Sequence, residues 1–305
     1  MLLLMLAQLA CGKHAVAPAS LSIDNATVPA TAPPSAQALH AGAGSFTFND
    51  PASPHNPPVT VWYYNPDVRE DSPVVFVMHG AGSSALQYRD GWAGYAAAEK
   101  FLLLAPEFSG PHASDTARYN LGGMMTEAGG RLDEACWTLT AIERIFDRVK
   151  AGTGLKTPGY CIYGHSAGAQ FVHRLVLFKP GARIRKAIAA NAGWYAMPDF
   201  RARFPYGLAD SGVDREALRK SFSQKLVILL GEGDTDPGHP GLRNTPEAMA
   251  QGKNRLERGR RFFGAARDGA AAAAMPFNWE LKIVSGAGHE NDKMSREALS
   301  ILLED

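Results

Sequence analysis

The segment 160–178, YCIYGHSAGAQFVHRLVLF, decides the fold of this chain. It begins as a short apolar strand and ends as an apolar helix, and the turn between them places Ser166 in a G-x-S-x-G motif. Such a tight turn excludes side chains two residues either side of the serine, where Gly164 and Gly168 stand. The Ser166 hydroxyl should then point outward at the start of a helix, where free amides and the helix dipole favour negative charge. This arrangement predicts a nucleophile, and an ordinary glycine-rich turn is the alternative.

The same alternation of strand and helix extends over most of the chain. Seven further strands are expected, at 45–49, 59–64, 74–78, 102–105, 187–190, 226–230 and 279–284. Besides the helix after Ser166, helical periodicity is present at 86–100, 132–149, 246–266 and 295–303. The pattern predicts an α/β fold with a mostly parallel, eight-stranded sheet and helices on both faces. Functional side chains are then expected at the carboxyl ends of the strands.

Two aspartates follow the strand expected at 226–230 and are candidates for the acid that orients a catalytic histidine. Asp234 stands three residues after Gly231 and is preferred to Asp236 on that spacing. A turn or capping role is the alternative for either aspartate. A metal site of Asp234, Asp236 and His239 is a further alternative, but no additional ligand has a recognisable spacing, so the sequence predicts no metal.

The last expected strand leads into the glycine-rich loop SGAGH, which presents His289 just before the final helix. Of the nine histidines, this one is the best candidate for the general base. It would take the proton of Ser166 and return it to the leaving group. The chain order Ser166, Asp234, His289 is also the order in which one class of catalytic triad occurs.

Backbone amides near the serine are expected to stabilise the oxyanion that forms during attack. Ala167 follows the nucleophile directly, and Ala81 lies in HGAG (79–82), which follows the third strand. Gly82 is an alternative to Ala81 as the second donor. Together these amides predict an oxyanion hole.

Aromatic residues and an irregular segment follow the sixth strand. Trp194 and Tyr195 are predicted to line the substrate pocket, with a plain core role as the alternative. The segment at about 197–223 contains proline and glycine with little periodicity, and it is expected to form a small cap over the site.

The N-terminal residues have the composition of an export signal and a tether. Residues 1–10 are apolar but too short to span a bilayer, and Leu9-Ala10-Cys11 resembles the end of a bacterial lipoprotein signal, with 1–11 as the signal segment. The basic n-region of an export signal is missing, so an ordinary apolar N-terminus is an alternative. Gln8 stands where an aliphatic residue is usual, so ordinary signal-peptidase cleavage is the alternative. Residues 12–44 are rich in Ala, Pro and Ser and predict a disordered linker. We expect export to the periplasm, to the outer surface through a lipid-modified Cys11, or into the medium.

The remaining 45–305 are expected to form one catalytic domain, because a chain of 305 residues with 46% hydrophobic content can bury a full core. Lys plus Arg (31) balance Asp plus Glu (30), which gives no electrostatic footprint for nucleic acid. Cys136 and Cys161 could pair in an oxidising compartment or remain as buried thiols. The oligomeric state has no signature in the sequence.

Taken together, these motifs resemble the α/β-hydrolase superfamily, and within it the bacterial polyhydroxybutyrate-depolymerase-like and dienelactone-hydrolase-like serine esterases. The resemblance rests on MHGAG (78–82), APEF (105–108), YNLGG (119–123), YGHSAGAQFVHR (163–174), NAGWY (191–195), GEGDTDP (231–237) and GAGH (286–289). It implies hydrolysis of a small-molecule or polymeric carboxylic ester through an acyl-serine intermediate, without a cofactor. The alternatives are a peptidase of the same fold and a catalytically silent, surface-anchored pseudo-hydrolase that binds a ligand. Acyltransferase and cofactor-free haloperoxidase chemistry would use the same residues.

Overall fold

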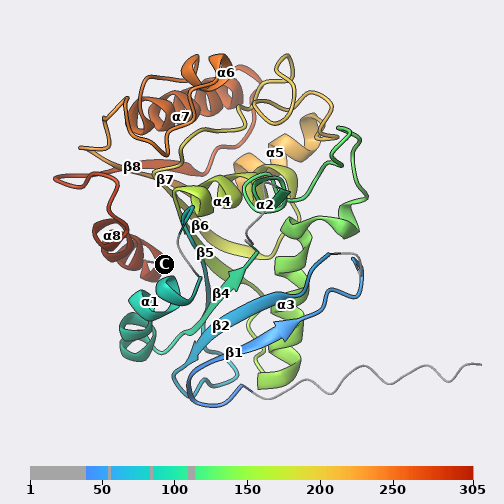
Figure 1. The fold of residues 1–305 in the computed structure, drawn as a ribbon, viewed down its shortest axis with the longest axis vertical. Coiled ribbons are helices and arrows are strands. Elements are labelled where there is room, and N and C mark those ends of the chain that lie inside the picture. The colour runs from blue at the N-terminus through green and yellow to red at the C-terminus, as the bar shows by residue number, and fades with distance from the viewer. Residues whose placement is uncertain (1–38, 54–55, 83–84, 109–113, 305) are drawn as a thin grey trace, which may run out of the picture. The chain divides into compact units, whose positions relative to one another are not determined.

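The eight expected strands form one sheet, in the order β1-β2-β4-β3-β5-β6-β7-β8, in the computed structural model of the protein (Figure 1). The structure describes residues 39–53, 56–82, 85–108 and 114–304. The strands are β1 (Gly42–Phe48), β2 (Val59–Asn65), β3 (Val74–Met78), β4 (Leu102–Glu107), β5 (Tyr160–His165), β6 (Ile184–Ala190), β7 (Leu226–Gly231) and β8 (Trp279–Val284). β2 is antiparallel to both β1 and β4, whereas every other pair of neighbouring strands is parallel. The predicted α/β sheet is therefore confirmed.

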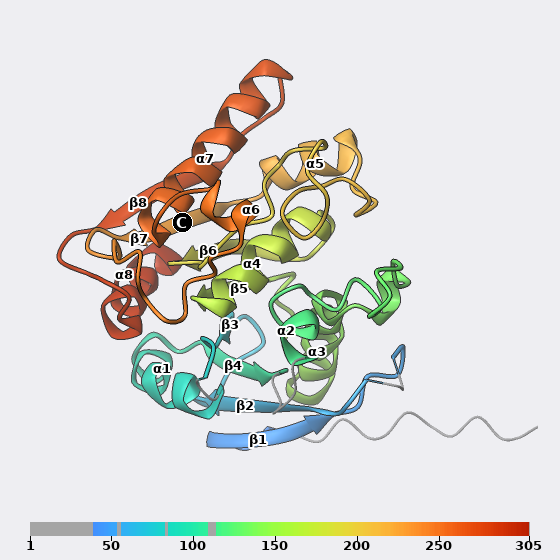
Figure 2. The same ribbon diagram turned by 45° about the horizontal axis from the view of Figure 1, so that its top comes forward.

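Helices cover both faces of this sheet (Figure 2). α1 (Ala85–Glu99) and α8 (Asn291–Leu303) pack on one face, and α3 (Thr138–Thr153), α4 (Ala167–Phe178), α5 (Arg215–Ser223) and α7 (Arg255–Ala272) pack on the other. β3 is buried along its whole length because alternate side chains enter opposite cores: Phe76 joins the α4 side and Val77 joins the α1 side. The shorter elements are α2 (Ser114–Arg118), α6 (Pro246–Met249) and the 3-10 turn η1 (Glu134–Cys136).

Two of the expected helices have different bounds. The single helix predicted at 246–266 is wrong: the chain forms α6 and α7, separated at Gly252, whose φ of +149° does not belong to a helix. Asn254 then starts α7, because its side chain accepts a hydrogen bond from the Glu257 amide at 2.9 Å. The helix predicted at 132–149 begins only at Thr138, after η1.

The predicted signal segment 1–11 and most of the predicted linker 12–44 lie outside the described residues. β1 begins at Gly42, before the predicted end of the linker, because residues 42–44 pair with residues 63–65 of β2. None of the helices in the described part of the chain is both long enough and apolar enough to cross a bilayer.

The topology brings the chemically interesting loops together. β3, β5, β6, β7 and β8 are mutually parallel neighbours, so their carboxyl ends meet at one edge of the sheet. The loops that follow these strands contain every residue that the sequence singled out for catalysis. That edge is therefore the candidate site.

Candidate active site

Ser166 stands at the turn between β5 and α4, half-buried, with a φ of +56°. Positive φ is strained for a residue with a side chain, and it aims the hydroxyl away from the helix. The two motif glycines permit this turn. A Cβ on Gly168 would fall against the Met78 carbonyl of β3, and a Cβ on Gly164 would fall against the Gly168 carbonyl. The local sequence thus forces the serine to the surface of the sheet edge.

The structure brings Ser166, His289 and Asp234 into one hydrogen-bonded line. Ser166 Oγ lies 3.1 Å from His289 Nε2, and His289 Nδ1 donates to Asp234 Oδ2 at 2.7 Å. The carboxylate is 3% exposed and the imidazole 21%. A buried carboxylate at Nδ1 orients the ring and leaves Nε2 to accept the serine proton.

Asp236, the alternative acid, does not face the histidine. It is exposed, and its Oδ1 accepts from the Gly238 amide at 2.8 Å. Asp234 is therefore the aspartate that bonds His289, and Asp236 forms a turn contact with the Gly238 amide.

Backbone and side-chain bonds join the loops that hold the acid and the base. Gly233 N donates to Ala287 O at 2.8 Å. Asn191, fully buried after β6, accepts from Gly231 N at 2.8 Å and donates to Gly288 O at 2.9 Å. Its φ of +52° is one that asparagine tolerates well. Asn191 was not predicted from the sequence, although it begins the NAGWY motif.

A buried cation lies behind the triad. Arg255, the first residue of α7, is 2% exposed, and its Nη1 is 3.4 Å from Asp234 Oδ1. Its Nη2 donates to His239 Nδ1 at 3.2 Å. Desolvation lowers the pKa of Arg255 from its ordinary value, while Asp234 opposes that shift. An arginine nevertheless keeps its charge, so the Asp234 carboxylate lies beside a fixed positive group.

Two further histidines surround His289. The ring centroid of His165 lies 4.7 Å from that of His289, and the ring of His239 lies 5.3 Å away. Burial, and then the neighbouring His289 and Arg255, hold the pKa of His165 well below its usual value. Burial likewise lowers the pKa of His239. Both rings therefore pack near His289 with a pKa below the ordinary value.

The loop that contains Ala81 is held against Ser166. The Tyr119 hydroxyl donates to the His79 carbonyl at 2.8 Å, and the two rings stack at 4.5 Å. A Cβ on Gly80 would lie 3.7 Å from the Cβ of Ser166. The predicted oxyanion donors, Ala81 and Ala167, both line a cavity of about 290 Å³ that also contains Ser166.

The structure separates the two aromatic residues predicted to bind substrate. Trp194 lies in the wall of the same cavity. Tyr195 is fully buried behind it and stacks on Phe262 at a ring distance of 4.4 Å. The side-chain amide of Gln251 bonds both the N–H and the C=O of Tyr195, at 2.9 and 2.8 Å. Tyr195 thus anchors the loop that carries Trp194.

Arg243 also lines the cavity of Ser166, and sequence analysis missed it. It comes from the loop before α6, which follows the acid turn. No motif identifies it, because a single arginine in a loop has no distinguishing spacing.

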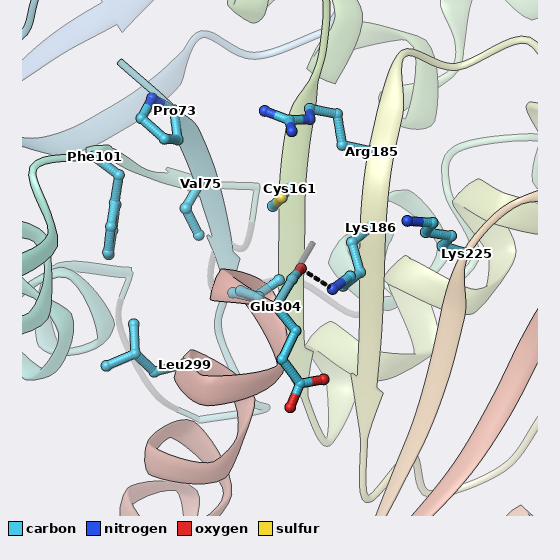
Figure 3. Close-up of a pocket in the computed structure, with 10 residues that line it drawn as sticks. Pro73, Val75, Phe101, Cys161, Arg185, Lys186, Lys225, Leu299 and Glu304 are labelled. Atoms are coloured by element: carbon cyan, nitrogen blue, oxygen red, sulfur yellow. Dashed lines mark hydrogen bonds between the residues drawn. The ribbon is translucent and has the colours of Figure 1, made fainter. Parts of the chain in front are cut away.

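A second cavity, of about 400 Å³, lies at the opposite, amino ends of the strands (Figure 3). Cys161 of β5 lies in its wall, and burial raises the pKa of that thiol. Lys186 Nζ donates to the Ile301 and Glu304 carbonyls, at 2.7 and 2.6 Å, and so caps the C-terminus of α8. Cys136 and Cys161 are both unpaired, as one alternative expected, but each is only partly buried.

No protein-family model and no curated protein sequence matches this chain. Solved structures do match it. Poly(aspartic acid) hydrolase-1 from Sphingomonas sp. KT-1 is 43% identical, over 87% of this chain and 100% of the other, with a TM-score of 0.84. Poly(3-hydroxybutyrate) depolymerase LpqC from Bordetella parapertussis is 34% identical, over 87% and 91%, with a TM-score of 0.82. The fluorophosphonate-binding serine hydrolase F of Staphylococcus aureus has the same fold at 16% identity, over 87% and 100%, with a TM-score of 0.56.

Proposed function

The chain belongs to the α/β-hydrolase superfamily and, within it, to the polyhydroxybutyrate-depolymerase-like serine esterases, and from this premise we propose that it cleaves carboxylic esters through an acyl-serine intermediate on Ser166. The observation that carries the proposal is the line of hydrogen bonds from Ser166 Oγ through His289 to Asp234. The proposal is also supported by the strained backbone of Ser166 and by the burial of Asp234. Hydrogen bonds between the loops that contain Asp234 and His289 support it as well.

In the first half-reaction, Ser166 Oγ attacks the ester carbonyl carbon while His289 Nε2 takes the hydroxyl proton. Asp234 stabilises the resulting imidazolium through the 2.7 Å bond to Nδ1. The carbonyl oxygen becomes an oxyanion, which accepts hydrogen bonds from the amides of Ala81 and Ala167. Each such donor contributes about 3 kcal/mol to transition-state stabilisation.

Collapse of this intermediate expels the alcohol, which receives the proton from His289 and leaves the acyl group on Ser166. A water molecule then attacks the acyl carbon, and His289 accepts its proton. The second tetrahedral intermediate releases the carboxylic acid, and the proton returns from His289 to Ser166 Oγ. No step needs an oxidant, a reductant or a further group.

The test is hydrolysis of p-nitrophenyl esters from acetate to decanoate by the full chain, beside Ser166→Ala. We expect turnover that falls at least about 10³-fold in the variant, and labelling of the wild type alone by a fluorophosphonate. Ser300→Ala is the matched control, because Ser300 is an exposed serine of α8. Absence of both turnover and labelling in the wild type would favour the ligand-binding alternative.

A second candidate is cleavage of amide bonds in an acidic polymer. It is favoured by the 43% identity to a poly(aspartic acid) hydrolase across that protein's whole length. The same triad would serve, with an amine in place of the alcohol as leaving group. Release of aspartate oligomers from poly(aspartic acid), lost in Ser166→Ala, is the result expected of this activity, and an intact polymer would exclude it.

Export, lipid modification of Cys11 and the cap at 197–223 stay predictions. Retention of the expressed chain in membranes, lost in Cys11→Ala, is the outcome expected of a lipid anchor. Release of both forms into the soluble fraction would instead favour ordinary signal cleavage or no export signal.

A further inference from the structure

Two arginines lie against one tryptophan in the wall of the catalytic cavity, and we call Arg174, Trp194 and Arg243 the arginine stack. The guanidinium carbon of Arg174 lies 4.4 Å from the ring centroid of Trp194, and that of Arg243 lies 4.9 Å from it. Arg243 also donates from Nε to the Tyr206 hydroxyl at 2.6 Å. The two distances from a guanidinium carbon to the Trp194 ring are within the range of cation–π attraction.

Neither arginine of the stack forms an ion pair within the part of the chain that the structure describes. Other arginines nearby do, since Arg201 pairs with Asp199 at 3.0 Å and Arg255 pairs with Asp234. The stack therefore places two positive charges against Trp194, with Arg243 in the cavity wall and Arg174 buried, and no anion among the described residues pairs with either.

Arg174 is the less usual of the two because it is fully buried. It donates to the Gln170 carbonyl at 3.0 Å and reaches the Pro205 carbonyl at 3.5 Å, while its Nε has no hydrogen-bond partner among the described residues. Burial and then the charge of Arg243 lower the pKa of Arg174 to about 9, which leaves it protonated at neutral pH. A buried charge is normally paired, so the stack lacks a counter-ion that it would gain from a ligand.

Arg243 is placed to meet such a ligand. Its side chain is exposed, and it lines the same cavity as Ser166. Tyr206 occupies only Nε, and the two Nη groups have no hydrogen-bond partner within the described ranges. A planar guanidinium with free Nη groups matches a carboxylate, which it can bind through two parallel hydrogen bonds.

We propose that the arginine stack is a carboxylate subsite of the catalytic cavity, so that preferred substrates are esters or amides that carry a carboxylate near the scissile bond. This inference rests on the proposed function and names the substrate class of that site. Arg243 binds the carboxylate directly. Arg174 acts from beneath Trp194, where its charge adds to the positive potential without touching the substrate.

The experiment compares two matched pairs of substrates at pH 7. On the acyl side, the pair is mono-p-nitrophenyl adipate and p-nitrophenyl hexanoate, which have acyl chains of equal length. On the alcohol side, the pair is 4-acetoxybenzoate and its methyl ester. The charge preference is the ratio of kcat/KM for the acid to kcat/KM for its neutral partner, measured for each pair.

We expect the charge preference in at least one pair to fall about tenfold in Arg243→Gln, the loss of one charged hydrogen-bonding partner. Arg243→Lys should recover part of it, because it keeps the charge but not the planar fork. Arg201→Gln is the matched control: Arg201 is an exposed arginine already paired with Asp199, and its removal should leave both ratios unchanged. In the wild type, raising the ionic strength should lower kcat/KM for the acid more than for the neutral ester.

An unchanged charge preference in Arg243→Gln for both pairs, with the neutral esters still hydrolysed by the wild type, would overturn the subsite and leave the esterase proposal standing. If the wild type hydrolyses none of the four substrates and no fluorophosphonate labels Ser166, the proposed function fails and the subsite fails with it.

Discussion

The carboxylate of Asp234 has two partners: the Arg255 guanidinium lies 3.4 Å from Oδ1, and the His289 imidazole lies 2.7 Å from Oδ2. The ion pair with Arg255 is buried, since the two side chains are 2% and 3% exposed, so solvent screens the attraction between the two charges only weakly. The contact with His289 is part-buried, because the imidazole is 21% exposed.

Arg255→Gln should lower the free energy of unfolding by about 3 kcal/mol, because it removes the positive partner of a carboxylate that is 3% exposed. The measurement is urea unfolding of the variant beside the wild type.

Arg255→Lys is the control for that experiment, since it keeps the charge and should lose less stability than Arg255→Gln. Equal free energies of unfolding in Arg255→Gln and the wild type would contradict the stabilising role of the buried pair.

The two aspartates of the acid loop should differ sharply on substitution. Asp234→Asn removes the charge that supports the imidazolium and should lower kcat by about 10³- to 10⁴-fold. Asp236→Asn should leave kcat within about threefold, because Asp236 is exposed and bonds only the Gly238 amide in the described part of the chain. Steady-state kinetics on both purified variants checks that Asp234, and not Asp236, is the orienting acid. Comparable losses of kcat in the two variants would refute this role of Asp234.

Stability should depend on pH through His173. This residue is fully buried; its Nδ1 donates to the Ala169 carbonyl and its Nε2 accepts from the Ala196 amide. Burial, and then Arg174, hold the pKa of His173 well below its usual value of about 6.5. The unfolded chain therefore binds a proton that the folded chain does not. This contribution is complete above about pH 6.5 and is lost as the pH falls from there toward the folded pKa.

The free energy of unfolding should accordingly drop between pH 7.5 and 5.5, and the drop should be about 1.4 kcal/mol smaller in His173→Gln. Urea unfolding at both pH values measures it. His165 and the carboxylates also titrate. The deciding quantity is therefore the difference between His173→Gln and the wild type in how far the free energy of unfolding drops. An identical drop in both proteins would mean that His173 is not buried neutral.

Close packing of α4 on β3 predicts that Gly168 tolerates no side chain. A Cβ there would fall against the Met78 carbonyl, which is rigid backbone, so Gly168→Ala should cost at least about 3 kcal/mol of stability. Gly264 of α7 offers the matched control, because a Cβ there meets open space. Gly264→Ala should gain up to about 1 kcal/mol through helix propensity. The midpoints of urea unfolding of Gly168→Ala and Gly264→Ala measure these changes in stability. Equal changes in the two variants would contradict the close packing at Gly168.

The sequence could predict Ser166, Asp234 and His289 as candidate site residues because each of them stands in a local sequence pattern. Ser166 is framed by glycines that the turn requires, and His289 ends a glycine-rich loop before the last helix. Asp234 follows a strand at a defined distance. The single helix expected at 246–266 was wrong because a local pattern does not show where this helix breaks. The apolar periodicity continues through Gly252, and only the backbone geometry at that residue reveals the break.

The sequence by itself determined the α/β class, the eight strands and the loops that carry Ser166, Asp234 and His289, because hydrophobic periodicity and the glycine demands of tight turns are properties of neighbouring residues. Only the tertiary structure decided which partners complete the site. Arg255 reaches Asp234, and Arg174 and Arg243 meet at Trp194, across elements far apart in the chain. Such contacts follow from how helices pack on the sheet, and a buried charge has no sequence pattern until its surroundings are known.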